Sequence, residues 1–187
     1  MTDRTVPSAL LVMDVQNGIV ENYEQTGVVE RIAQAVAAAR GAGVPVIFVR
    51  VAFRPGAPEV SPRNRIFGLA GATGVVSVDE ATIVIDPRVA PQPGEVVVTK
   101  RRVSAFTGSD LEVILRAGAV EELVLCGIST SGVVLSTLRQ AADQDYGLTV
   151  LRDACADGDD EVHRVLTEKV FPRQAEVLDV AGWAATL

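Results

Sequence analysis

The chain has 187 residues, a formal net charge of −7 at pH 7 and 48% apolar residues. This length and apolar content suit one globular domain, which we expect to span residues 1–187. The acidic balance gives no electrostatic reason to bind nucleic acid or an anionic membrane surface. No secretory signal precedes the first apolar run, and no apolar run approaches the length of a membrane span. Two cysteines cannot build a disulfide scaffold, so we expect a protein of the reducing cytoplasm.

Short apolar runs alternate with stretches of helical spacing along the chain. The expected strands are residues 9–13, 44–51, 95–99, 123–126, 148–151 and 176–178. The expected helices are residues 28–37 before Gly41 and Gly43, a helix opening at Ser109, one from Val133 to Gly147, one from Asp159 with Val162 inward, and residues 180–187. Residues 68–93 have weak periodicity, with candidate short elements at 75–78 and 82–85. The alternation predicts an α/β fold, a three-layer α/β/α sandwich with a mostly parallel, Rossmann-like sheet.

Charged residues follow two of these strands directly. Asp14 ends the first apolar run, and Lys100 ends the third. Because ligands bind at the carboxyl edge of open α/β sheets, we expect both residues to lie on that rim. As alternatives, Asp14 is a turn residue and Lys100 a solvated loop lysine. Arg54 lies in a loop at the same edge, where it could bind an anionic substrate, although a solvated side chain is the interpretation we favour.

The stretch from Glu122 to Ala142 is the centre of the pattern. A buried strand is broken by Gly127, small polar residues follow, and a helix begins at once. The small residues of this turn are Ser129, Thr130, Ser131 and Gly132. A tight strand-to-helix turn aims backbone N–H groups at one point, which attracts a carboxylate or an oxyanion. The stretch by itself is equally an ordinary joint of a parallel sheet, and taken alone it favours that interpretation.

Several short motifs occur in a characteristic order at the strand ends. They are Asp14-x-Gln16, Lys100-x-x-x-Ser104-Ala-Phe106, Gly127-Ile-Ser-Thr130 with Thr137, and Asp153-Ala-Cys155 with His163. Together they resemble the isochorismatase-like hydrolases, which include nicotinamidases, N-carbamoylsarcosine amidases and isochorismatases. The resemblance covers nearly the whole chain and implies a single isochorismatase-like domain with a small-molecule substrate. We also expect a homo-oligomer.

The resemblance implies an Asp–Lys–Cys triad in the amidase branch, and this chain departs from it. Asp14 and Lys100 match the first two members. The family's cysteine stands three residues after the first Thr of its motif and four before the second, and both Thr130 and Thr137 place Val133 there. A valine cannot attack a carbonyl or carry an acyl group. We therefore expect a member of the cysteine hydrolase family that lacks the nucleophile.

Two further features of the family bear on the chemistry. Nicotinamidases carry metal ligands after the second strand, where this chain has Val51-Ala-Phe53, so we expect no metal and no cofactor. Isochorismatases work without the cysteine, because hydrolysis of a vinyl ether needs a proton on carbon and then water. An Asp acid with a Lys beside it can serve that reaction.

Three hypotheses follow. The first is a cofactor-free hydrolase with Asp14 as general acid/base and Lys100 as its electrostatic partner, in which Gln16, Arg54 and residues 129–132 bind the substrate. The second uses Ser129 or Ser131 as a replacement nucleophile. The third is an inactive member that binds a small ligand or serves as an oligomeric scaffold, with Asp14 and Lys100 merely satisfying each other. We place the first ahead, the third as its rival and the second last.

Overall fold

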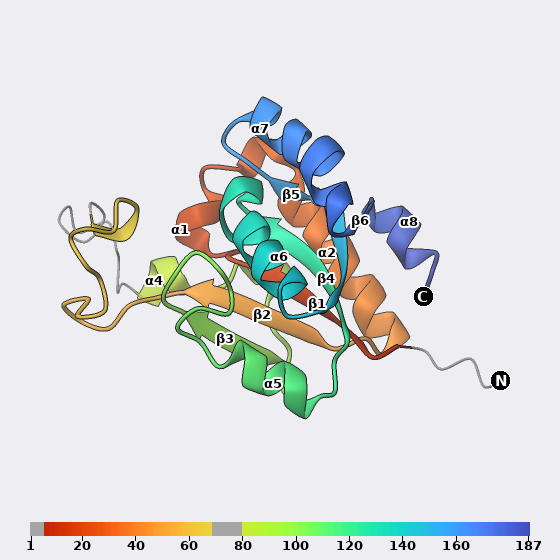
Figure 1. The fold of residues 1–187 in the computed structure, drawn as a ribbon, viewed down its shortest axis with the longest axis horizontal. Helices are drawn as coiled ribbons and strands as arrows, with labels where there is room; N and C mark the ends of the chain where they lie inside the picture. Colours follow the sequence, from red (N-terminus) through yellow and green to blue (C-terminus); the bar gives the residue numbers. More distant parts are fainter. Residues whose placement is uncertain (1–5, 69–79) are drawn as a thin grey trace.

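The structure, a computed structural model, describes residues 6–68 and 80–187 and is built on one sheet (Figure 1). Within these residues six strands follow the order β3-β2-β1-β4-β5-β6, and all neighbours are parallel. The strands are β1 (Ser8–Met13), β2 (Val46–Val51), β3 (Val96–Lys100), β4 (Glu122–Ile128), β5 (Gly147–Ala156) and β6 (Glu176–Leu178). This is the Rossmann order, which reverses between β1 and β4. The expected Rossmann-like sheet is confirmed, and the described sheet is parallel throughout.

Helices cover both faces of the sheet and complete the three layers (Figure 1). The helical segments are α1 (Asn17–Val20), η1 (Glu24–Thr26), α2 (Val28–Ala42), α4 (Glu80–Ile83), η2 (Pro87–Val89), α5 (Leu111–Ala117), η3 (Thr130–Val134), α6 (Leu135–Ala142), α7 (Asp160–Val165), η4 (Leu166–Val170), η5 (Phe171–Arg173) and α8 (Val180–Ala184). Leu10 and Val12 of β1 pack in a core with α2 and α8, whereas Leu11 and Met13 pack in a core with α5 and α6. Successive strand residues face opposite sides, so a strand buried on both faces needs an unbroken apolar run.

The predicted break at Gly127 is wrong, because β4 continues through this residue to Ile128. Gly127 pairs with Met13 of β1 and has φ 137°. A Cβ atom at this position would lie 2.1 Å from the Met13 carbonyl oxygen. The glycine therefore permits a close approach of two strands that a side chain would prevent. As a result, the turn that follows β4 begins beside the end of β1.

Other element boundaries also differ from the expectation. Helix α2 runs through Gly41 and ends at Ala42, and the following Gly43 caps it in the left-handed conformation with φ 73°. A glycine in a helix costs only about 1 kcal/mol, which the packing of a long amphipathic helix offsets. The helix after β4 ends at Ala142, before the expected stop at Gly147, which instead begins β5. Because β5 extends to Ala156, Cys155 lies within the strand and pairs with Gly127.

The described part of the segment between β2 and β3 contains little regular secondary structure. The expected element at 75–78 lies outside the described residues. At 82–85 the structure has the end of α4 and then Ile85, which forms an antiparallel bridge with Gln16. In the part of the chain that the structure describes, no helix is long and apolar enough to cross a membrane.

Candidate functional site

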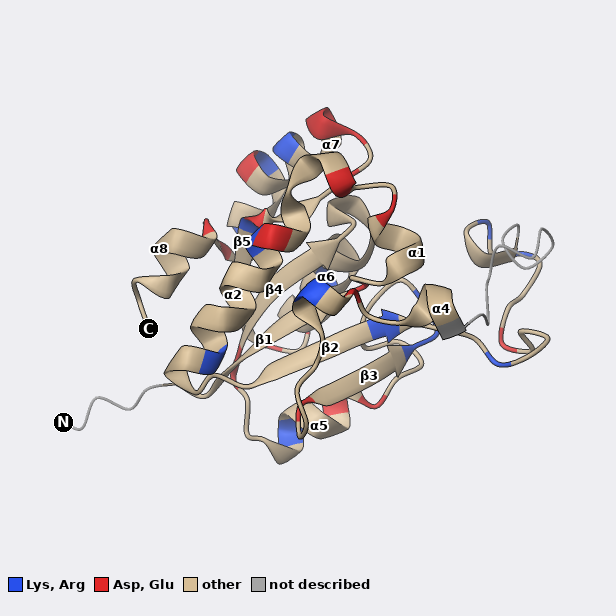
Figure 2. Ribbon diagram, turned by 180° about the vertical axis from the view of Figure 1, so that it is seen from behind, with Lys and Arg blue, Asp and Glu red and all other residues tan. Residues whose placement is uncertain are grey.

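The candidate site lies at the carboxyl edge of the sheet, next to the reversal between β1 and β4. Asp14 follows β1, Lys100 is the last residue of β3, and Ser129 opens the turn after β4. Figure 2 shows basic segments at the carboxyl ends of β2 and β3. In open α/β sheets this edge, at the point where the strand order reverses, is where a crevice forms for a ligand. The topology therefore brings the motif residues of three strands to one rim.

Asp14 and Lys100 form a buried ion pair. The Lys100 Nζ atom lies 2.8 Å from Asp14 Oδ2 and also donates to the carbonyl oxygens of Arg102 and Val103, each at 2.9 Å. Asp14 is 6% exposed and Lys100 is 1% exposed. The second carboxylate oxygen, Asp14 Oδ1, is buried and has no hydrogen-bond partner. One oxygen is thus fixed by the ammonium group, and the other is left for a proton or a substrate.

The environment of this pair favours the protonated carboxyl group. Burial raises the pKa of Asp14 to about 6, and the nearby Lys100 opposes the shift without cancelling it. A carboxyl group that titrates so near neutrality can donate or accept a proton at working pH. Of the two opposing influences on the pKa of Asp14, burial is therefore the larger.

The backbone of Asp14 is held in an uncommon conformation. Its φ of 57° lies in the left-handed region, which residues with a Cβ atom rarely adopt. The Asp14 N–H group donates to the Val49 carbonyl oxygen at 2.8 Å, so β2 fixes the start of the turn. Strained residues persist where the surroundings determine them, and they concentrate at functional sites.

Gln16 ties the loop after β1 to the end of β2. Its Nε2 atom donates to the Val51 carbonyl oxygen at 3.0 Å, and its Oε1 atom accepts from the Val51 N–H group at 2.7 Å. Both ends of this buried amide are engaged with backbone. The structure thus assigns Gln16 a structural contact, and its contact with a substrate stays a prediction.

Arg54 lies in the loop after β2, and its side chain is 65% exposed. Its Nη1 atom is 3.3 Å from Glu59 Oε1, and the same oxygen lies 3.1 Å from Arg101 Nε. Glu59 therefore links the loop to the turn after Lys100. The structure shows an exposed arginine paired with a carboxylate, and its role in substrate binding is a prediction that no contact here tests.

Three of the N–H groups in the turn after β4 are bonded within the protein, and an anion site at the others stays a prediction. The Ser131 N–H group donates to Asp157 Oδ2 at 2.6 Å, and the Gly132 and Val134 N–H groups both donate to the Ser129 carbonyl oxygen at 3.2 Å. The Ile128–Ser129 peptide bond is cis. These three N–H groups have partners within the protein, so they do not offer an anion site as the turn stands.

His163 contacts this turn from α7, which Asp159 caps as predicted. The Nδ1 atom of His163 lies 2.8 Å from Oγ1 of the fully buried Thr130. Burial lowers the pKa of His163, against the influence of Asp157 and Asp160. The expectation that Val162 faces inward is wrong, because it is exposed and His163 takes the inward position. The sequence motif includes His163 but does not predict its contact with Thr130, because the spacing of the two residues carries no sign of it.

Val133 and the loop after Lys100 pack around the start of α6. Val133 is 2% exposed and belongs to the core that includes Ala105 and Phe106. The Ala105 N–H group donates to Thr137 Oγ1 at 3.0 Å, which fastens this loop to α6. Two separate motifs of the sequence thus meet in one contact. The position of Val133 as the replacement for a cysteine remains a prediction.

Neither cysteine has the surroundings of a nucleophile. Both Cys126 and Cys155 are buried. Burial raises the pKa of Cys126 well above its usual value and that of Cys155 to about 12. A thiol is reactive as the thiolate, so both thiols are inert at neutral pH.

Within residues 6–68 and 80–187, no three His, Cys, Asp or Glu side chains are grouped so that they could hold a metal ion. Val51 ends β2, and Phe53 packs on Phe67 with ring centroids 5.3 Å apart. The expected absence of a metal stays a prediction, which metal analysis of the protein can test.

Comparisons with known proteins agree with this architecture. The isochorismatase domain family matches residues 8–182. An uncharacterized isochorismatase family protein of Bacillus subtilis, YwoC, is 35% identical over 166 residues, which cover 89% of this chain and 86% of that protein. The ureidoacrylate amidohydrolase RutB of Methylobacterium radiotolerans is 31% identical over 202 residues, 95% of this chain and 78% of that protein.

A solved structure gives the same result. An isochorismatase family protein from Burkholderia thailandensis superposes with a TM-score of 0.83 at 30% identity, covering 97% of this chain and 95% of that one. Sequence match, strand order and the charged residues at the strand ends thus point the same way. The chain belongs to the isochorismatase family.

Proposed function

We propose that this protein is a hydrolase of a small molecule that works without a cysteine nucleophile. In this proposal Asp14 is the general acid/base and Lys100 its electrostatic partner. The observation that supports it is the buried pair, in which Lys100 holds Asp14 Oδ2 at 2.8 Å while the buried Oδ1 has no partner. A buried polar atom without a hydrogen-bond partner is uncommon in proteins. In this proposal Oδ1 has none because it carries the proton that is transferred to the substrate.

Hydrolysis of a vinyl ether suits this arrangement. The protonated Asp14 gives its proton to the vinyl carbon, which leaves an oxocarbenium-like centre and a carboxylate. Water then adds to that centre and returns a proton to Asp14, and the resulting hemiketal collapses to a carbonyl compound and an alcohol. No covalent intermediate with the protein is needed, so a valine at position 133 is no obstacle.

Lys100 makes the proton available. When Asp14 gives up its proton, the ammonium group at 2.8 Å stabilises the carboxylate that forms. With a pKa of about 6, roughly one Asp14 in ten is protonated at pH 7. The acid is therefore present in useful amounts and is still acidic enough to release its proton.

The relatives' names suggest a second class of substrate for the same site. RutB proteins are ureidoacrylate amidohydrolases, so ureido compounds and primary amides belong in any substrate test. Hydrolysis of these would require Asp14 as a base that activates water. The two roles give opposite pH profiles: as an acid, kcat/KM falls as pH rises through about 6, whereas as a base it rises.

The test is a screen of vinyl ethers, including isochorismate, together with ureido compounds and primary amides. We expect hydrolysis of at least one class, lost in Asp14→Asn and retained in the control Asp110→Asn, whose side chain is exposed and caps no N–H group. Activity that survives in Asp14→Asn would contradict the role of this residue.

The rival proposal is an inactive member that binds a small ligand or forms an oligomeric scaffold. Its support is that Val133 packs in an apolar core and that Lys100 is fully satisfied by Asp14 and two carbonyl groups. A ligand bound equally well by wild type and Asp14→Asn, with no hydrolysis by either, would favour this alternative.

A further inference from the structure

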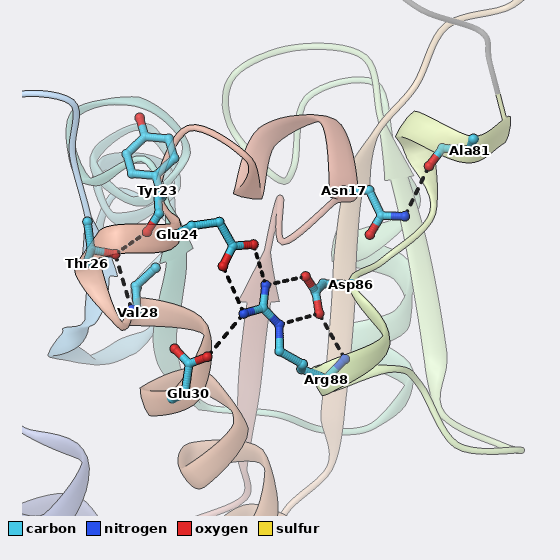
Figure 3. Close-up of polar contacts among 9 residues, drawn as sticks. All are labelled: Asn17, Tyr23, Glu24, Thr26, Val28, Glu30, Ala81, Asp86 and Arg88. Carbon is cyan, nitrogen blue, oxygen red and sulfur yellow. Dashed lines mark hydrogen bonds and ion pairs between the residues drawn. The ribbon is translucent and has the colours of Figure 1, made fainter.

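Arg88 is the centre of a polar cluster on the side of the molecule that carries α2 (Figure 3). Its guanidinium group donates two hydrogen bonds to Asp86, at 2.9 and 2.7 Å, and two to Glu24, at 3.1 and 2.8 Å. A fifth reaches Glu30 at 3.1 Å. One arginine thus joins the turn η2 to η1 and to α2. Its fork geometry suits such paired contacts with carboxylates.

The segment that Arg88 fastens lies along the loop after Asp14. The Asp86 N–H group donates to the Val15 carbonyl oxygen at 2.9 Å, and the Asn17 N–H group donates to the Val84 carbonyl oxygen at 3.0 Å. The Asn17 side chain adds a bond to the Ala81 carbonyl oxygen at 3.1 Å. Residues 84–86 therefore form a short antiparallel brace on residues 15–17.

This brace completes the support of Asp14. On one side, the side chain of Gln16 holds residues 15–17 to Val51 of β2. On the other side, residues 84–86 hold their backbone. Asp14 precedes this clamped segment directly and has the uncommon φ of 57°. Such a conformation is kept only where its surroundings determine it from several sides.

We propose that Arg88 is a positioning residue for Asp14: it fastens the brace 84–86 to η1 and α2, and the brace holds the backbone that aims the Asp14 carboxyl group at Lys100. Without the guanidinium group, Asp86, Glu24 and Glu30 would be three neighbouring carboxylates that repel one another. The brace would then separate from η1 and α2, and water would reach Asp14. The catalytic meaning of this device rests on the proposed function, whereas the geometric claim does not.

The experiment measures the titration of Asp14 itself, by carbon-13 NMR of the aspartate carboxyl groups, with Asp14→Asn identifying the signal. In Arg88→Met we expect the midpoint to fall from about 6 by at least ~0.5 pH unit, because burial is the largest cause of the raised pKa. Arg88→Lys keeps the charge but loses the fork, so its midpoint should lie between the two. The control is Arg116→Met, which removes an exposed arginine paired with Glu112 on α5.

The outcome separates positioning from mere stabilisation. A less stable Arg88→Met protein whose Asp14 midpoint stays at the wild-type value, or rises, overturns the proposal. Should Arg88→Met not fold, Glu24→Ala removes two of the five hydrogen bonds and is judged by the same criterion. The Asp14 titration needs no substrate, so it tests the role of Arg88 independently of the proposed hydrolase activity. Either proposal can therefore be refuted while the other holds. With a substrate in hand, Arg88→Met should lower kcat more than it changes KM.

Discussion

Replacing Lys100 by methionine tests the buried pair most directly. Methionine keeps an unbranched apolar stem and removes the ammonium group, so the change is chiefly electrostatic. The sequence has one other lysine, Lys169, which is exposed on η4 and provides a matched control as Lys169→Met.

The structure sets the expected size of the effect. Asp14 would stay 6% exposed with neither oxygen bonded by a side chain, since Lys100 is its ion-pair partner and Oδ1 has none. Removing one partner of a buried ion pair typically costs about 3–5 kcal/mol of unfolding free energy. Asp14→Asn should cost less, because Lys100 keeps its bonds to two carbonyl oxygens.

The sign of the pH dependence follows from the pKa of Asp14. In the folded wild type this pKa is raised from 3.8 to about 6, and losing Lys100 removes the influence that lowers it, so in the variant it rises further. Between the unfolded and the folded pKa, the folded state binds more protons than the unfolded state. Stability therefore falls as pH rises through this window, and it falls over a wider window in the variant. The deficit of Lys100→Met should be largest above neutrality and should shrink in acid.

Urea unfolding followed by circular dichroism at about pH 5 and about pH 8 provides the measurement. We expect Lys169→Met to stay within roughly 0.5 kcal/mol of wild type at both values. The reasoning is refuted if Lys100→Met is as stable as the control at the higher pH, or if its deficit does not shrink at the lower one.

Three other predictions concern a close strand contact, the family's cysteine position and the absence of a metal. Gly127→Ala should destabilise the fold by about 3 kcal/mol or more, because the new Cβ would lie 2.1 Å from the Met13 carbonyl oxygen and φ is 137°. The control is Gly41→Ala in α2, whose Cβ would meet nothing within 4 Å. We expect this control to stabilise the fold by roughly 0.5–1 kcal/mol in the same urea assay. If Val133 stands at the family's cysteine position, the thiol of Val133→Cys should react with iodoacetamide faster than the two native cysteines, because burial raises the pKa of both native thiols. Mass spectrometry that places the adduct on a native cysteine would contradict this. Any hydrolase activity should survive metal chelators, and stoichiometric zinc or iron lost together with activity would refute that expectation.

The position of the site could be predicted from the sequence because it depends on few physical facts. A buried parallel strand needs an unbroken apolar run, and its first charged residue then falls at the carboxyl edge. Asp14 and Lys100 were placed on one rim by this reasoning, and their contact at 2.8 Å agrees with it. No detail of side-chain packing was needed for that step.

The contacts around the site could not be predicted in this way. In the sequence Gly127 resembles a strand breaker. The structure shows instead that a Cβ atom there would lie 2.1 Å from the carbonyl oxygen of Met13 on the neighbouring strand. The bond from Ser131 to Asp157 and the three bonds from Arg88 to Glu24 and Glu30 join residues that are distant in sequence, and neither set has a periodic signal. Long-range polar contacts form only once the fold exists, so a pattern of spacing does not contain them.

The surroundings of Val133 bear on the proposal that this rim works without a thiol. Around Val133 the N–H groups of Ser131, Gly132 and Val134 are already bonded to protein oxygens, and the valine side chain packs in the core. These three N–H groups therefore need no negative charge at position 133. The buried charges at this rim that face each other are Asp14 and Lys100, so we expect the chemistry to be the transfer of one proton at one carboxyl oxygen.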